Sequence, residues 1–304
     1  MHINQRDYSL DILRALGLFL IILAHCNPPD WLFQLRNFDV PLMVIVSAAT
    51  YSFLYQNKHI CAQDFYKKRL HKLIVPAWIF LSLFFVVTDL VCIGLHINFP
   101  FSAKDILSSY FFYSGIGYVW ILRIFILIAL LTPPLLSFKK TFTHTPLYFG
   151  LVLSVYTAYE IAVILTHKIL PDGGVLKFID TMIFPVIPYA VLYAYGIKMT
   201  ELSQKSFLAI TAMCFFIFVG MALYFSAHLH AGFLQTQTAK YPPTLYYLSY
   251  AVFCTNSVYL LSQTKCIKFL PEKFLTWVSV HSLWIYLWHI GLLYLWTYSL
   301  SLDG

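Results

Sequence analysis

The sequence predicts an all-α protein, a polytopic bundle of about nine to ten helices embedded in a membrane. Three observations support this prediction. Of the 304 residues, 60% are hydrophobic and only 11% are charged, whereas about a quarter of a soluble domain is usually charged. The apolar residues form long unbroken runs rather than alternating, which excludes a transmembrane β-barrel. No separate water-soluble segment remains, so residues 1–304 are predicted to form a single transmembrane domain.

The first apolar run, Leu10–Cys26, carries three polar residues on one helical face. Arg14 and His25 are eleven residues apart, so they lie one above the other, roughly 16–17 Å apart along the axis. Asp11 lies one turn before Arg14. Charges inside an apolar segment face a bundle interior or a wet cavity by default. The run is therefore interpreted as a retained span with a functional stripe, and its charges argue against a cleaved signal peptide.

Eight further runs are long enough to cross a membrane. The run from Tyr118 is predicted to end at Pro133-Pro134, and the run from Ile183 is predicted to be kinked by its prolines. The aromatic segment Phe101–Tyr113 is interfacial, re-entrant or a short tenth span. The eight runs are Val40–Tyr55, Leu73–Leu95, Tyr118–Leu136, Leu147–Leu165, Ile183–Ile197, Phe207–Phe225, Leu245–Leu261 and Phe274–Leu295.

The basic residues predict the orientation of the chain. With the N-terminus in the cytoplasm, thirteen of them fall in inner loops and five in outer loops, which is the expected positive-inside bias. The net charge of +7 therefore indicates membrane topology, and a nucleic-acid partner is not expected. Six scattered cysteines without a CxxC pair predict neither disulfides nor a metal site. The five outer basic residues are Arg36, Lys104, Lys168, Lys177 and Lys240.

Two roles remain open for each main residue of the stripe. His25 is either an interhelical hydrogen-bonding group or a general base, because the ordinary pKa of histidine lies near neutrality. Arg14 is suited to an ion pair with Asp11 one turn away, and this role does not exclude binding of a phosphate through its forked guanidinium. The residue types alone do not decide between these roles.

The roles of several other charged residues are also considered. Arg69 and Lys72 are one turn apart and open the third span, where they anchor the helix at the cytoplasmic surface or add to a phosphate site. Asp39 at the start of the second span is interpreted as an N-terminal helix cap. Mutual pairing is one option for the single intramembrane charges Asp89, Arg123 and Glu160.

Five motifs follow one another along the chain. They are Arg14 followed after ten residues by His25; Phe38-Asp39-Val40-Pro41-Leu42 leading to Ser47; Arg69, Lys72 and Pro76; Tyr118-Val119-Trp120-Ile121-Leu122; and Ser282 to His289 with Ile285-Tyr286-Leu287. In this order they resemble the membrane acyltransferase-3 family, the bacterial O-acyltransferases of surface polysaccharides and related glycans. The sequence departs from the family pattern at Lys72, where a second Arg is usual, and the Lys lacks the bidentate fork.

The resemblance implies a membrane-embedded O-acyltransferase, first of all an O-acetyltransferase, in the bacterial cytoplasmic (inner) membrane. The donor would be cytoplasmic acetyl-CoA or another short acyl-CoA as co-substrate, with no bound cofactor. The acceptor would be a hydroxyl of an extracytoplasmic or lipid-linked glycan. His25 would be the general base or carry the acyl group itself, and Asp11 would orient Arg14. The implied substrate-binding residues are Arg14, Asp39, Ser47, Arg69, Lys72, Trp120, Arg123 and His289.

Two other classes of protein remain as alternatives. A secondary transporter or flippase would line its path with intramembrane charges, but such proteins favour inverted repeats with broken helices in both halves. Only the sixth span shows kink signals here. A non-catalytic membrane subunit would use His25 as an interhelical contact. The charges that a transport path would use are Arg14, Asp89, Arg123 and Glu160.

Overall fold

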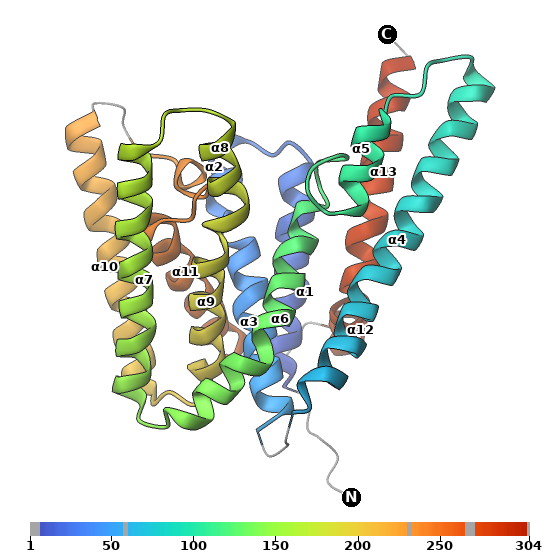
Figure 1. The fold of residues 1–304 in the computed structure, drawn as a ribbon. Helices are drawn as coiled ribbons and strands as arrows, with labels where there is room; N and C mark the ends of the chain where they lie inside the picture. Colours follow the sequence, from blue (N-terminus) through green and yellow to red (C-terminus); the bar gives the residue numbers. More distant parts are fainter. Residues whose placement is uncertain (1–6, 57–59, 230–232, 265–270, 303–304) are drawn as a thin grey trace, which may run out of the picture. The chain divides into compact units, whose positions relative to one another are not determined.

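The computed structural model describes residues 7–56, 60–229, 233–264 and 271–302, and every regular element in these ranges is a helix (Figure 1). This confirms the predicted all-α fold. Seven of the described helices are long and apolar enough to cross a membrane. The number is eight if α12 (Glu272–Val280) and α13 (Ser282–Leu302) together form one broken span.

The chain forms two compact units. The first comprises Met1–His59 and Pro134–Ser279, and the second comprises Ile60–Pro133 and Val280–Gly304. The chain passes between the units three times, so neither unit is one continuous segment of sequence. The single transmembrane domain over residues 1–304 stays a prediction.

Helix α3 (Asp39–Leu54) is the centre of the first unit. Twelve of its sixteen residues are buried, and it packs against α1 (Tyr8–His25), α9 (Val186–Met199) and α11 (Leu245–Ser262). The backbones of α3 and α9 come close together at Gly196. A Cβ on Gly196 would lie 2.5 Å from the Ile45 carbonyl oxygen and 2.8 Å from Ala48 Cβ. Small residues allow such close helix packing in membranes.

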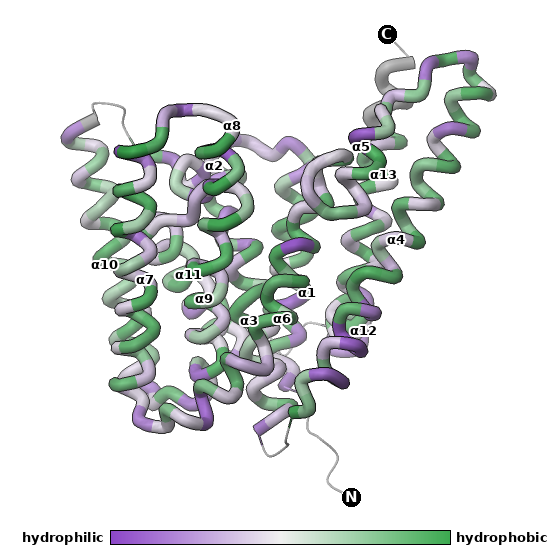
Figure 2. The backbone as a smooth tube through the Cα atoms, in the orientation of Figure 1, coloured by the Kyte–Doolittle hydropathy of each residue, from purple (hydrophilic) through white to green (hydrophobic). Residues whose placement is uncertain are grey.

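The remaining elements of the first unit surround this core, and tyrosine and asparagine side chains connect them. Tyr148 donates a hydrogen bond to the Ala194 carbonyl at 2.8 Å, and Tyr195 donates to Asn256 Oδ1 at 2.8 Å. Hydrophobic residues dominate the middle of α7 and α10, while hydrophilic residues gather in the loops at their ends (Figure 2). The elements are α2 (Asp30–Leu35), the end of α6 (Trp120–Thr141) from Pro134, α7 (Thr145–Ile169), α8 (Gly174–Phe178), the π-helix η1 (Ile179–Ile183), α10 (Gln204–Leu229), the 3-10 helix η2 (Thr236–Ala239) and α12 as far as Ser279.

The second unit contains α4 (Ala62–Leu95), α5 (Ala103–Tyr110), the part of α6 up to Pro133, and α13. Helix α5 has eight residues and is about 12 Å long, too short for a hydrocarbon core of about 30 Å. It lies against α4, where Trp78 Nε1 donates to the Tyr110 carbonyl at 3.1 Å. The predicted Phe101–Tyr113 segment is therefore not a crossing.

Helix α6 does not end at Pro133-Pro134 as predicted, because it continues to Thr141. Proline has no backbone N–H, so Pro134 leaves the carbonyl of Leu130 without its helical donor. The Tyr66 hydroxyl donates to that carbonyl at 2.9 Å. A side chain from α4 thus supplies the hydrogen bond that proline removes, and the helix tolerates the pair.

Other boundaries also differ from the prediction. The run Phe274–Leu295 is not one uninterrupted helix, because it is broken at His281 between α12 and α13. Helix α4 begins at Ala62, so the basic segment before Leu73 is helical. Helix α11 has 18 residues but is not among the helices apolar enough to cross alone. It carries Tyr, Ser, Thr and Asn, many of them buried within the unit, so the ninth crossing stays a prediction.

Candidate functional site

The N-terminal half of α1 is held by its acidic residues. Asp7 is the N-cap and accepts a hydrogen bond from the Ser9 amide at 3.0 Å, which satisfies one of the unpaired donors of the first turn. Asp11 is buried, and its Oδ1 accepts a hydrogen bond from Ser279 Oγ at 2.6 Å. Because Ser279 lies in α12, Asp11 connects two parts of the first unit that are far apart in sequence.

Arg14, one turn after Asp11, reaches from α1 to α3. Its Nη2 donates a hydrogen bond to Thr50 Oγ1 at 2.9 Å. The Thr50 hydroxyl in turn donates to the Val46 carbonyl at 2.8 Å, which fixes the orientation of the acceptor. Helical spacing predicts Asp11 as a partner of Arg14 and gives no sign of Thr50.

The contact between Arg14 and Thr50 sets the register of α1 against α3. The two helices pack together and run in opposite directions (Figure 1). Eleven residues separate Arg14 from His25 along α1, and eleven separate Thr50 from Asp39 along α3, roughly 16–17 Å in each case. His25, the last residue of α1, and Asp39, the first residue of α3, therefore lie at the same end of the helix pair.

Asp39 is the centre of a buried ion network. Its Oδ2 lies 2.6 Å from Arg36 Nη1, and its Oδ1 lies 3.6 Å from Lys240 Nζ and accepts a hydrogen bond from the Val40 amide at 2.7 Å. At most 4% of each of the three charged side chains is exposed. The predicted N-cap role of Asp39 is wrong, because Phe38 is the N-cap and Asp39 begins α3.

The network extends through neutral residues and holds an excess of positive charge. Lys240 Nζ donates to Asn37 Oδ1 at 3.0 Å, and Asn37 Nδ2 donates to Thr236 Oγ1 at 3.0 Å. Two cations face one carboxylate, and Arg36 Nε has no hydrogen-bond partner among the described residues. Burial lowers the pKa of Lys240; Asp39 partly opposes this effect and Arg36 adds to it.

The two cations of this network were not predicted from the sequence, where Arg36 and Lys240 count as outer-loop charges. One signal was present for Arg36, which precedes Asp39 by the three-residue spacing of helical ion pairs. Lys240 lies about 200 residues further along the chain and gave no signal in the sequence.

The predicted site residues fall into two sets, one in each compact unit. In the first unit, Ser47 is buried in the middle of α3. In the second unit, Arg69 is half-buried on α4, and Lys72 is exposed one turn later. The first set is Asp11, Arg14, His25, Asp39 and Ser47, and the second set is Arg69, Lys72, Trp120, Arg123 and His289.

One tyrosine of the second unit, Tyr286, connects the turn that carries His289 with the segment just before Trp120. His289 is buried on α13, and its Nδ1 contacts the carbonyl of Tyr286 in the preceding turn. The Tyr286 hydroxyl donates a hydrogen bond to the carbonyl of Tyr118, two residues before Trp120. Half-buried Arg123 lies one turn further along α6. These contacts bring the last two motifs of the family pattern together.

Two of the charged residues considered for a transport path are Glu160 and Asp89, and the structure shows the surroundings of each. Glu160 on α7 accepts a hydrogen bond from the Leu245 amide at 2.7 Å, at the first residue of α11, and another from the Tyr156 hydroxyl. A carboxylate at that position satisfies an unpaired donor and interacts favourably with the helix dipole. Asp89 is exposed on α4. Glu160 therefore has a clear structural role.

Within the described ranges, no group of three or more His, Cys, Asp or Glu side chains is placed to hold a metal ion. The prediction of a site without metal or bound cofactor stays a prediction.

The fold is that of a helical membrane protein. The five motifs of the acyltransferase-3 pattern lie in order along its chain. The chain matches the family model of the acyltransferase-3 family, described as an acyltransferase domain, over residues 7–304. The protein is therefore a membrane acyltransferase, and it belongs to the acyltransferase-3 family. No curated protein and no solved structure matches the chain.

Proposed function

We propose that this acyltransferase moves a short acyl group, acetyl first of all, from cytoplasmic acyl-CoA to a hydroxyl of an extracytoplasmic or lipid-linked glycan. The observation that supports this proposal most strongly is the register of α1 on α3. It separates Arg14 from the end that holds His25 and the Asp39 network by roughly 16–17 Å. An extended donor with charged phosphates at one end and a thioester at the other suits that separation.

The donor phosphates would bind at the Arg14 end. A guanidinium binds phosphate oxygens through paired hydrogen bonds, whereas the ammonium of a lysine acts as a point charge. Arg69 and Lys72, one turn apart near the start of the apolar part of α4, are proposed as further phosphate ligands. Asp11 would hold α1 in place through Ser279 and so position Arg14.

His25 would carry out the acyl transfer in one of two ways. As a general base, it accepts the proton of the acceptor hydroxyl while the oxygen attacks the thioester carbonyl. A C–O bond then forms, the C–S bond breaks and the CoA thiolate leaves and takes up a proton. As an acyl relay, the imidazole nitrogen attacks first, and the glycan hydroxyl then displaces it. Both ways consume one acyl-CoA and release one CoA for each acyl ester.

The other residues of the family pattern are proposed to bind the substrates. Asp39 and Ser47 belong to α3, while Trp120, Arg123 and His289 belong to the second unit. The proposed location is the bacterial inner membrane with the N-terminus in the cytoplasm, because thirteen basic residues are then expected on the inner side. This orientation puts Arg14 toward the cytoplasm, which is the side that contains acyl-CoA.

The proposed acyl transfer is tested in membrane vesicles by following the labelled acetyl group of acetyl-CoA. Inverted vesicles that contain the protein receive acetyl-CoA with a labelled acetyl group, and the label is counted in the glycan and glycolipid fractions. The wild type should label them and His25→Ala should not. His144→Ala, which changes an exposed histidine before α7, should behave as the wild type. Solute flux without any acetyl label would contradict the proposal and favour a transporter.

A further inference from the structure

The buried network around Asp39 contains more positive charge than its own residues neutralise. Arg36 and Lys240 face the single carboxylate of Asp39, and at most 4% of each of these side chains is exposed. Burying a charge without a counter-charge is strongly unfavourable. With both cations charged, the network therefore needs one further negative charge to become neutral.

The hydrogen-bond donors of the two cations also exceed the acceptors around them. Both carboxylate oxygens of Asp39 are engaged, Oδ2 by Arg36 Nη1 at 2.6 Å and Oδ1 by the Val40 amide at 2.7 Å. Arg36 Nε is buried and has no hydrogen-bond partner among the described residues. Lys240 Nζ donates to Asn37 Oδ1 at 3.0 Å, and its distance of 3.6 Å from Asp39 Oδ1 exceeds that of a normal hydrogen bond. The cations thus have donors for a further acceptor.

Two buried tyrosine hydroxyls lie near the same charges. They belong to Tyr189 on α9 and Tyr247 on α11, and neither makes a hydrogen bond of normal geometry within the described ranges. Both tyrosines interact electrostatically with Asp39. Lys240 Nζ lies 5.8 Å from the centre of the Tyr247 ring. Because buried hydroxyls nearly always have a partner, these two are further donors for a ligand.

The network lies directly beneath the surface of the first unit. Leu35 and Tyr241, the chain neighbours of Arg36 and Lys240, are 55% and 42% exposed. The charged side chains themselves are almost fully covered, so only a compact group fits among them.

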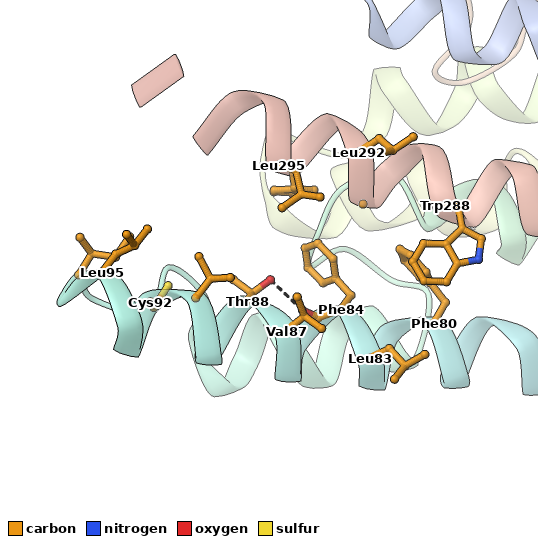
Figure 3. Close-up of a pocket in the computed structure, with 14 residues that line it drawn as sticks. Phe80, Leu83, Phe84, Val87, Thr88, Cys92, Leu95, Trp288, Leu292 and Leu295 are labelled. Atoms are coloured by element: carbon orange, nitrogen blue, oxygen red, sulfur yellow. Dashed lines mark hydrogen bonds between the residues drawn. The ribbon is translucent and has the colours of Figure 1, made fainter. Parts of the chain in front are cut away.

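A groove between α4 and α13 of the second unit has the opposite chemistry (Figure 3). Its volume is about 350 Å³, and none of the described side chains that line it is charged. The Thr88 hydroxyl in its wall donates to the Phe84 carbonyl of its own helix at 2.7 Å. An anion placed there would lose its hydration without gaining a counter-charge. A bound anion is therefore expected at the network and not in the groove.

We propose that the two cations and the two tyrosine hydroxyls bind one compact monovalent anionic group, with the size of a carboxylate or a halide ion. Its single negative charge matches the excess of one cation, and it accepts hydrogen bonds from Arg36 Nε and the hydroxyls. The group has two possible sources. It is a free anion from solution, or it is the carboxylate of an acidic sugar in the acceptor, because the network lies at the end of α1 and α3 that holds His25. Only the second source rests on the proposed acyl transfer.

The experiment measures thermal unfolding of the full-length purified protein in detergent. Chloride or acetate replaces the sodium salt of a bulky sulfonate at constant ionic strength, so that only the anion changes. The wild type should show a saturable rise in the midpoint of unfolding, because a ligand that binds the folded state stabilises it. Arg36→Gln and Lys240→Met each remove the excess charge and should lose this rise.

Asp39→Asn should have the opposite effect on anion binding. It leaves two cations without a carboxylate, so the anion should bind about tenfold or more tightly, because one repulsive charge is removed. The anion should also recover part of the stability that this variant loses. A network with a structural role alone predicts no anion effect in either protein.

A tyrosine variant keeps the inference testable if Asp39→Asn does not fold. Tyr247→Phe retains every charge and removes one donor, so it should weaken anion binding severalfold. Tyr224→Phe is the matched control, because Tyr224 lies on α10 and is exposed, and it should respond as the wild type.

Two sugars distinguish the sources of the anionic group. Glucuronic acid should bind more tightly than acetate if the group belongs to an acidic sugar, and less tightly if it is a free anion. Glucose, which has no carboxylate, should have no effect. Either order of glucuronic acid and acetate supports the anion site.

The outcomes also separate this inference from the proposed function. It would be overturned if neither the wild type nor Asp39→Asn showed a saturable rise, or if Arg36→Gln and Lys240→Met responded as the wild type. Anion binding in a protein that transfers no acyl group to any acceptor would contradict the proposed function while the anion site remained.

Discussion

Arg14 on α1 and Thr50 on α3 are joined by a hydrogen bond of 2.9 Å, and this contact fixes which residues meet at the two ends of the helix pair. Eleven residues away along each helix are His25 and Asp39. The helix pair therefore has one polar end around Arg14 and another with the His25 imidazole and the buried Asp39 carboxylate, which Arg36 and Lys240 contact. This arrangement is what the proposed donor path requires.

Removing the Thr50 hydroxyl should weaken donor binding without removing the charge. In Thr50→Val, Arg14 loses its fixed acceptor, and the dissociation constant of CoA should rise severalfold, corresponding to about 1 kcal/mol for one hydrogen bond. Thr157→Val is the matched control, because Thr157 makes the same bond to its own helix on the exposed side of α7. Calorimetric titration measures the effect, and unchanged affinity in Thr50→Val would exclude Thr50 as a positioning residue.

Replacing Asp39 should destabilise the protein strongly. In Asp39→Asn, Arg36 and Lys240 remain buried without their carboxylate, and breaking a buried ion pair in this way costs about 3–5 kcal/mol. Lys240→Met should cost less, because Arg36 and Asp39 still neutralise each other. Thermal unfolding in detergent should therefore rank the wild type first, Lys240→Met second and Asp39→Asn last. The reverse order of the two variants would contradict this account of the network.

The lowered pKa of Lys240 predicts a pH dependence of stability. The folded protein releases the Lys240 proton at a lower pH than the unfolded chain, whose lysine titrates near 10.5. Between these two pKa values the unfolded state binds more protons, so the unfolding free energy should rise with pH. The rise should be smaller in Lys240→Met. Identical slopes in the two proteins, measured by denaturant unfolding at several pH values, would show that Lys240 does not contribute.

Glu160 should affect stability and not acyl transfer. In Glu160→Gln, the start of α11 loses a charged acceptor for the Leu245 amide, which should lower stability by about 1 kcal/mol. Asp89→Asn on the exposed face of α4 is the control and should change neither property. Thermal unfolding and label transfer are measured on the same preparations. Full stability of Glu160→Gln with loss of activity would instead place Glu160 on a substrate path.

The positions of most helices followed from the apolar runs, because a chain in a membrane must satisfy its backbone hydrogen bonds within each segment. The Arg14–His25 stripe followed from helical spacing alone, and the family match over residues 7–304 agrees with the motifs. These features depend on residues that are close together in the sequence, so they can be predicted from the sequence alone.

The features that were not predicted depend on residues far apart in sequence. The continuation of α6 past Pro133-Pro134 requires the Tyr66 hydroxyl, about 60 residues earlier. The network around Asp39 requires Lys240, about 200 residues later. No spacing rule connects such positions. Asp39 was therefore interpreted as an N-cap from its place in the local sequence, whereas its contacts in the structure are tertiary.

The most direct test of the central claim separates donor binding from chemistry on α1. CoA affinity and the release of CoA from acetyl-CoA are measured on purified wild type, Arg14→Ala, Arg14→Lys and His25→Ala. Arg14→Ala should weaken CoA binding by about tenfold or more, as for loss of a hydrogen bond to a charged group, and Arg14→Lys should recover part of it.

His25→Ala should bind CoA like the wild type but release it at a rate lower by about 10²–10⁴, the usual contribution of a general base. This separation of effects is the result that the account predicts. Unchanged CoA affinity in both Arg14 variants, together with normal CoA release by a folded His25→Ala protein, would contradict it.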